Sequence, residues 1–133
     1  EKWKPNARSC TLKITQGSQA LLLTGDIEAQ QEALLVRTFG EDLRAKVLLV
    51  PHHGSGTSST LPFLRSVEPE LALFQVGYRN RYRHPKQEIY DRYGELGIAR
   101  LRNDVSGAIT LRFGKELTVS EYRREHARYW YGR

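Results

Sequence analysis

The chain contains 133 residues, of which 39% are hydrophobic and 27% charged, and its formal net charge at pH 7 is +6. This length is enough for one compact domain, and no repeat or linker divides residues 1–133, so we expect a single domain. No stretch approaches the roughly 18 continuous apolar residues of a membrane-spanning helix, and the single cysteine excludes an internal disulfide. The positive charge favours a polyanionic partner such as nucleic acid, the alternative being a solvated basic face.

The pattern of apolar residues predicts strands and helices in alternation along the chain. Strands are expected where apolar residues alternate with polar ones or form short runs, at residues 9–15, 20–24, 47–50, 71–76, 98–101 and 108–113. Helices are expected at residues 28–39 and 61–67, from just after Pro85 to near Gly97, and in the tail at 120–131. In the first helix, the residues expected to face the core are Ala29, Ala33, Leu34 and Phe39. This order predicts an α/β fold with helices packed on a sheet.

An acidic residue, Asp26, follows the apolar strand expected at 20–24. Gly25 between them allows the backbone to turn sharply, which presents Asp26 at the edge of the sheet. Open α/β sheets build their sites at this edge, so Asp26 is a candidate site residue. The alternative is that its side chain only caps the helix expected at 28–39.

Two adjacent histidines, His52 and His53, follow the strand expected at 47–50. Neutral imidazole is the commonest transition-metal ligand in proteins, and the end of a strand holds it rigidly. Because adjacent side chains diverge, we expect one histidine to bind metal and the other to support it or contact substrate. This pair is harder to explain by packing than a lone histidine would be.

Two motifs in this order resemble the last metal-binding motifs of the metallo-β-lactamase fold. They are Thr-Gly-Asp at residues 24–26 and Pro-His-His-Gly-Ser at residues 51–55. Nearly the whole chain except its basic tail further resembles the C-terminal domain of the ComEC family of competence proteins, on the segments at 6–12, 22–28, 52–55 and 77–85. The resemblance implies part of an αββα metallo-β-lactamase fold, namely its C-terminal half, with a mixed sheet and helices packed on it.

The resemblance also implies a chemistry. In the ComEC family this domain is thought to be a metal-dependent nuclease that degrades the DNA strand not taken up. By the motif match, Asp26 bridges two divalent metals, zinc or manganese, and His53 binds one of them. His84 and His52 are the catalytic candidates, with His84 placed to reach the scissile phosphate or protonate the leaving oxygen. The alternative for His84 is that it caps the following helix.

The remaining candidates are residues expected to contact substrate, namely Asn6, Ser9, Ser55, Arg79, Asn80, Arg81 and Tyr82. The arginines and the asparagine of the basic loop would hold flanking phosphates, and Tyr82 would stack on unpaired bases. Asn6 and Ser9 fall where many relatives carry another metal-binding histidine, so they would contact substrate or a water on the metal. The alternatives are half-buried packing for Tyr82 and simple turn formation for Asn6 and Ser9.

One part of the family pattern is missing. The His-x-His-x-Asp-His motif is absent, and Asp26 with one histidine does not reach the three or four protein ligands of a tight site. Because the sequence also lacks methionine, we expect a piece of a longer protein whose upstream part supplies the other ligands. The isolated chain is then expected to be inactive, to hold metal weakly or not at all, and to pair with another copy through an exposed sheet face.

Partners and location follow from the resemblance alone. It implies an inner-membrane protein whose DNA-uptake channel belongs to the same polypeptide, with this domain on the periplasmic or extracellular face and DNA as its partner. Two other functions stay open at this point. One is a non-catalytic DNA-binding module of the uptake machinery, and the other is a hydrolase of the same fold that acts on another small ester.

Overall fold

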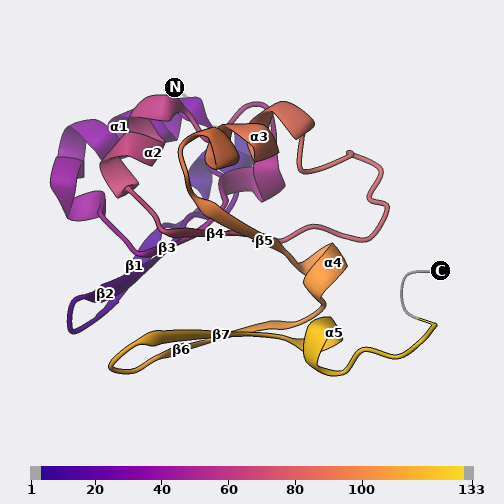
Figure 1. Ribbon diagram of the computed structural model, residues 1–133. Helices are drawn as coiled ribbons and strands as arrows, with labels where there is room; N and C mark the ends of the chain where they lie inside the picture. Colours follow the sequence, from indigo (N-terminus) through magenta and orange to yellow (C-terminus); the bar gives the residue numbers. More distant parts are fainter. Residues whose placement is uncertain (1–3, 131–133) are drawn as a thin grey trace.

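A computed structural model describes residues 4–130 of the chain and shows two sheets with helices. The main sheet has five strands in the order β1 (Leu12–Gln16), β2 (Gln19–Leu23), β3 (Val47–Leu49), β4 (Leu71–Phe74) and β5 (Ala99–Arg102). The helices α1 (Ala29–Phe39), α2 (Leu61–Val67) and α3 (Gln87–Glu95) cover one face of it, as Figure 1 shows. On the other side lies a hairpin of β6 (Ile109–Phe113) and β7 (Leu117–Glu121), flanked by the short helices α4 (Asn103–Ser106) and α5 (Tyr122–Glu125).

The main sheet is mixed. The first hairpin pairs β1 antiparallel to β2, whereas β2, β3, β4 and β5 run parallel to one another. Parallel neighbours need a crossover, and α1, α2 and α3 supply the crossovers. The carboxyl ends of β2, β3 and β4 therefore lie at one edge of the sheet. The prediction of an α/β fold with a mixed sheet and packed helices is confirmed.

The six expected strands all form, with ends that differ by a few residues, but the helix expected at 120–131 is wrong. Residues 117–121 form β7, which pairs with β6 from Phe113↔Leu117 to Ile109↔Glu121. Only four residues of the expected helix are helical, in α5, and residue 131 lies outside the described residues. The three-residue turn at 114–116, which begins with Gly114, joins two runs with β-branched residues, and cross-strand pairing in that hairpin outweighs the helical pattern.

The buried face of α1 also differs from the expectation. The four residues expected to face the core are exposed, whereas Gln31 and Glu32 are buried and Leu35 and Val36 pack against the core. The positions 31, 32, 35 and 36 lie on one side of a helix with 3.6 residues per turn. Because two of them are polar, the apolar pattern alone pointed to the wrong side. Most of the rest of the core comes from side chains of β2, β3, β4, α2 and α3, including Leu22, Leu48, Phe63, Leu64, Phe74 and Tyr93.

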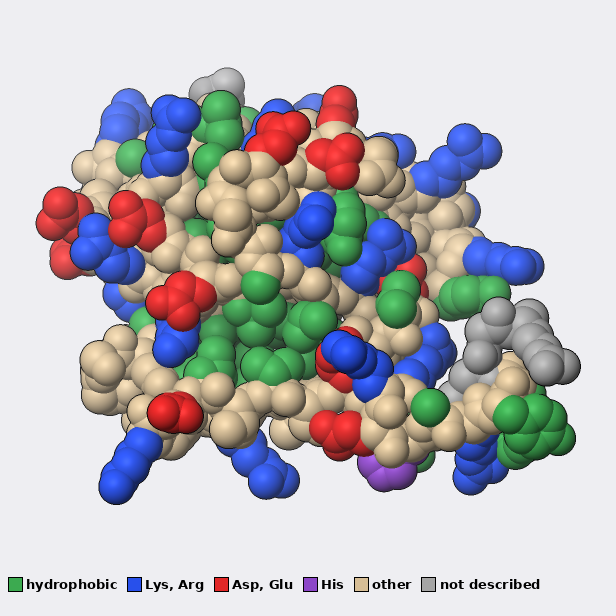
Figure 2. All heavy atoms as spheres, in the orientation of Figure 1, with side chains coloured by type: hydrophobic (Ala, Val, Ile, Leu, Met, Phe, Trp, Pro, Cys, Tyr) green, Lys and Arg blue, Asp and Glu red, His purple; other side chains and the backbone are tan. Residues whose placement is uncertain are grey.

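The second face of the sheet is only partly covered. Between the sheet and the β6–β7 hairpin lies a cavity of about 320 Å³, lined by Leu49, Leu73, Ile109 and neighbouring residues. Figure 2 shows hydrophobic side chains gathered in the hollow between these two layers. At the edge of the sheet every residue of β1 is exposed, including Leu12 at 55% and Ile14 at 50%. No helix within residues 4–130 is long and apolar enough to cross a membrane.

Candidate functional site

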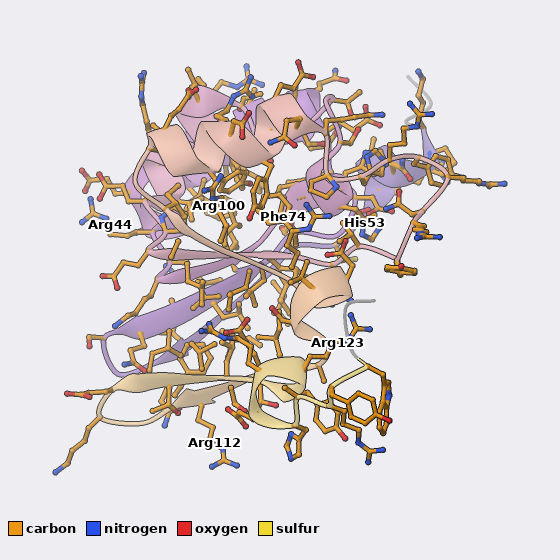
Figure 3. All side chains as sticks on the ribbon, turned by 45° about the vertical axis from the view of Figure 1, so that its right-hand side comes forward. Arg44, His53, Phe74, Arg100, Arg112 and Arg123 are labelled. Atoms are coloured by element: carbon orange, nitrogen blue, oxygen red, sulfur yellow. The ribbon has the colours of Figure 1, made fainter. Side chains whose placement is uncertain are left out.

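Segments that follow three neighbouring strands meet at one edge of the main sheet. Asp26 follows β2, the short turn Pro51–Gly54 with its two histidines follows β3, and the loop at residues 75–86 follows β4. His53 is labelled at this edge in Figure 3, and the loop after β4 extends beside it. A short 3-10 helix, Pro5–Arg8, approaches from the start of the chain and brings Asn6 next to His52.

The turn that carries Asp26 is fixed by its backbone. Gly25 has a φ of +57°, and a side chain there would come within 3.0 Å of the Ser9 Cβ atom. The Ser9 hydroxyl accepts the Asp26 N–H at 3.1 Å. The alternative role for Asp26, capping α1, is wrong, because the N-cap is Glu28, whose N–H donates to the Gln31 side chain at 3.1 Å. The Asp26 carboxylate is therefore left to the site.

The His53 ring points to Asp26. Its Nε2 atom lies 3.3 Å from Asp26 Oδ1, and its Nδ1 atom lies 2.6 Å from the Gln75 carbonyl oxygen. Because a carbonyl oxygen only accepts, Nδ1 carries the proton of that bond. In a neutral ring, Nε2 is then an acceptor that faces a carboxylate, which is also an acceptor. A proton or a cation between the two atoms resolves this contact.

The His52 ring faces a different set of partners. Its Nε2 atom lies 3.3 Å from the Asn6 amide nitrogen, and its Nδ1 atom lies 3.4 Å from the Thr57 hydroxyl. Its ring centroid is 5.9 Å from that of His84. Both adjacent histidines have a positive φ, 50° for His52 and 57° for His53. Residues other than glycine rarely adopt this conformation, and such strain concentrates at functional sites.

The loop after β4 is held by Asn80. Its side-chain oxygen accepts the His84 N–H at 2.8 Å, and its amide nitrogen donates to the carbonyl oxygens of Gly77 and His84 at 3.1 and 2.7 Å. Both amide hydrogens are thus used within the loop, so the predicted phosphate contact by Asn80 requires one of these bonds to break. In the structure, Asn80 instead fixes the backbone that carries His84.

The rings and guanidinium groups of this loop pack on one another. The Tyr82 ring stacks on His84 with centroids 5.8 Å apart, and the Arg81 guanidinium lies 4.7 Å from the Tyr82 centroid. The Arg79 guanidinium lies 5.2 Å from the Tyr78 centroid. Arg79, Arg81 and Tyr82 are exposed, with Tyr82 at 57%. The loop therefore presents positive charge and aromatic surface beside the histidines.

His84 is partly buried beside His52. Burial lowers its pKa below the usual 6.5, Lys86 and the two other histidines add to this, and Asp26 opposes it. Its Nδ1 atom is buried with no hydrogen-bond partner among residues 4–130. The alternative that His84 caps the next helix is wrong, because the N-cap of α3 is Lys86. A lowered pKa favours the neutral form of the imidazole, which can accept a proton.

Beside these groups lies a cavity of about 370 Å³. The residues that line it are His53, Gln75, Val76, Gly77, Asn80, Tyr82, His84 and Asn103. Sequence reasoning missed Asn103, whose side-chain oxygen accepts the Val76 N–H at 2.7 Å. The signal was available, because Asn103 directly follows β5 and so lies at the same edge as Asp26 and the histidines.

The structure thus brings together eight of the predicted site residues, namely Asn6, Ser9, Asp26, His52, His53, Asn80, Tyr82 and His84. Ser55 is buried, and its hydroxyl lies 3.0 Å from the Thr57 hydroxyl, so it supports the loop rather than facing the cavity. Among residues 4–130 no three His, Cys, Asp or Glu side chains form a group that could hold a metal. Asp26 and His53 supply an oxygen and a nitrogen donor, which fits part of a metal site.

Comparisons with known proteins agree with the competence resemblance. The chain is 40% identical over 125 residues to the competence protein ComA of Neisseria gonorrhoeae, which is 94% of this chain and 18% of that protein. It is 32% identical to recombination protein 2 of Haemophilus influenzae and 34% identical to ComE operon protein 3 of Bacillus subtilis, over 96% and 88% of this chain. The chain spans only 16% and 15% of those two proteins. No protein-family model matches it.

Proposed function

We propose that this chain is part of the metallo-β-lactamase-type domain of a ComEC-family DNA-uptake protein and contributes to metal-dependent hydrolysis of DNA. The observation that carries the proposal is the contact of His53 Nε2 with Asp26 Oδ1 at 3.3 Å, in a ring whose Nδ1 is bound to a carbonyl oxygen. A metal ligand with such an outer hydrogen bond is the usual arrangement for histidine in metal sites. The homologues with competence names support the setting.

Asp26 and His53 would hold a divalent cation, zinc or manganese, with two cations in the complete site. When bound, such a pair of cations provides Lewis-acid stabilisation of the phosphate oxygens and activates a water molecule as the nucleophile. The two donors fall short of the three or four protein ligands required. We therefore propose that the other ligands come from polypeptide outside this chain and that the chain alone is inactive.

The other residues act on the substrate. His84, whose pKa is lowered by burial, would transfer a proton at the scissile phosphate, accepting one as the neutral ring or delivering one as the protonated ring, and His52 beside it would contact the same group. Arg79 and Arg81 would bind flanking phosphates, because their guanidinium groups are exposed on the loop next to the cavity. Asn6 would contact substrate, a role supported by its position next to His52.

The protein that contains this chain would be an inner-membrane protein, with the channel on the same polypeptide and this domain on the periplasmic or extracellular face. A second function is favoured by one observation, the lack of a three-ligand group among residues 4–130. Under that alternative the chain is a non-catalytic DNA-binding module. Its DNA binding would weaken with salt but would not respond to a chelator.

The test uses the full-length protein and single-stranded DNA in the presence of manganese or zinc. We expect Asp26→Ala and His53→Ala each to abolish cleavage, since each removes a metal ligand. Asp91→Ala is a matched control, because this exposed carboxylate on α3 accepts a hydrogen bond from the Gln87 side-chain amide of the same helix at 2.8 Å. If both site variants cleave as fast as the parent protein, the assignment of the metal ligands is wrong.

A further inference from the structure

A buried carboxylate lies outside the candidate site. Glu32 on α1 is fully buried, at 0% exposure. Its Oε2 atom accepts the Ser59 N–H at 2.6 Å, and its Oε1 atom accepts the Thr60 N–H at 2.8 Å. Burial raises the pKa of Glu32, whereas these two hydrogen bonds and Arg92 act in the opposite direction. A carboxylate is costly to bury unless its oxygens are bonded, and here both are.

Ser59 is bound at every polar group it has. Its N–H donates to Glu32, its hydroxyl lies 2.8 Å from the Tyr93 hydroxyl, and its carbonyl oxygen accepts from Arg92 Nη1 at 2.7 Å. Ser59 is itself fully buried and has a φ of +62°. A serine in the left-handed region stays there only when its surroundings impose it. We call Glu32, Ser59, Arg92 and Tyr93 the Ser59 cluster.

The loop that ends at this cluster leads back to the candidate site. It comprises residues 55–60, directly after the turn with the two histidines. The Ser58 hydroxyl donates to the Ile27 carbonyl oxygen at 2.7 Å, and the Thr57 carbonyl oxygen accepts the Ala29 N–H at 2.9 Å. The Thr57 hydroxyl lies 3.4 Å from His52 Nδ1. One loop therefore contacts both the segment after Asp26 and the ring of His52.

We infer that the Ser59 cluster is a positioning device: Glu32 fixes loop 55–60 from behind and thereby sets the orientation of the His52 ring and of the segment that follows Asp26. Glu32, Arg92 and Tyr93 reach the loop from two different helices, α1 and α3. The loop thus connects helices α1 and α3 to the residues at the edge of the sheet. The inference rests on the proposed function in one respect, namely that this edge of the sheet is a site. The claim that Glu32 sets the orientation of the His52 ring holds whether or not the protein hydrolyses DNA.

The test compares two variants with a control by NMR on the 133-residue chain. Glu32→Gln keeps the size of the side chain but turns an NH₂ group toward a backbone N–H. Tyr93→Phe removes only one hydroxyl and is the milder change, so it serves where Glu32→Gln does not fold. Val67→Ala is the matched control, because Val67 is equally buried but lies at the other end of α2 from the loop.

In Glu32→Gln we expect hydrogen exchange to accelerate about tenfold or more at one of the two amides, Ser59 or Thr60, since one of these N–H groups loses its acceptor while the other keeps the Gln carbonyl oxygen. We also expect the imidazole ¹⁵N resonances of His52 to shift in Glu32→Gln and, less strongly, in Tyr93→Phe. Val67→Ala should leave the His52 resonances unchanged even though it lowers stability. If the His52 resonances stay unchanged in both cluster variants, or move as much in the control, the inference is wrong.

Activity of the full-length protein separates this inference from the proposed function. If the parent protein does not cleave DNA but the His52 resonances respond as expected, the proposed function fails and the positioning role stands. If the parent cleaves DNA and Glu32→Gln retains full kcat with unmoved His52 resonances, the positioning role fails alone.

Discussion

Gly54, directly after the histidine pair, is the position where a single methyl group should do most damage. Its φ is +81°, and an added Cβ would lie 2.6 Å from Pro85 Cβ and 3.1 Å from two ring carbons of the buried Phe74. We predict that Gly54→Ala lowers the free energy of unfolding by about 3 kcal/mol, of which about 1 comes from the left-handed backbone and about 2 from overpacking. Pro85 follows His84, so the same clash disturbs the site.

Urea denaturation followed by circular dichroism measures this loss. The matched control is Gly97→Ala, because Gly97 has a similar φ of +74° but nothing within 4 Å of the added Cβ. The control should lose only the backbone contribution, about 1 kcal/mol. Equal losses in the two variants would refute the close packing of the histidine turn against Pro85 and Phe74.

Three further predictions concern the hairpin, the sheet edge and the basic loop. Hydrogen bonds from Ser106 and then Arg124 lower the pKa of Glu121 in the folded chain. Its contribution to stability is therefore present above pH 4.5 and is lost as the pH falls through the lower folded-state pKa. In denaturation curves measured at different pH, Glu121→Gln should reduce this loss of stability at acid pH. The isolated chain should self-associate through β1 in light scattering, and Ile14→Lys should yield a monomer; a clean monomer of the parent at high concentration would contradict this. In salt titrations of DNA binding, Arg79→Ala should reduce the slope of log K against log salt by about 1. Arg112→Ala, on the distant hairpin, should leave the slope unchanged. Equal effects of the two variants would argue against the loop as the binding surface.

The candidate site could be predicted from the sequence because it obeys a simple rule of parallel sheets. Asp26 and the histidine pair each follow an apolar run, and the carboxyl ends of parallel strands share an edge. The same rule finds Asn103 after β5, although sequence reasoning did not apply it there. The loop with His84 follows β4 and joins them for the same reason.

The supporting residues could not be predicted in the same way. Glu32 belongs to a helix in which an acidic side chain is normally exposed, and its partners lie 27 and 28 residues further along the chain. Only the folded structure shows that two backbone N–H groups require an acceptor there. The role of Asn80 could not be predicted either, because an asparagine in a loop can bind a phosphate or its own backbone. Only the contacts in the structure show that Asn80 binds its own loop.

The most direct test of the account is the metal content and metal affinity of the full-length protein and its variants. We predict that the parent protein binds zinc or manganese and that Asp26→Ala and His53→Ala each weaken this binding by at least about tenfold, in line with the loss of a ligand. His126→Ala, which removes an exposed histidine stacked on Tyr122 in the tail, should leave binding unchanged. Unchanged metal binding in both site variants would contradict the central claim that Asp26 and His53 are metal ligands.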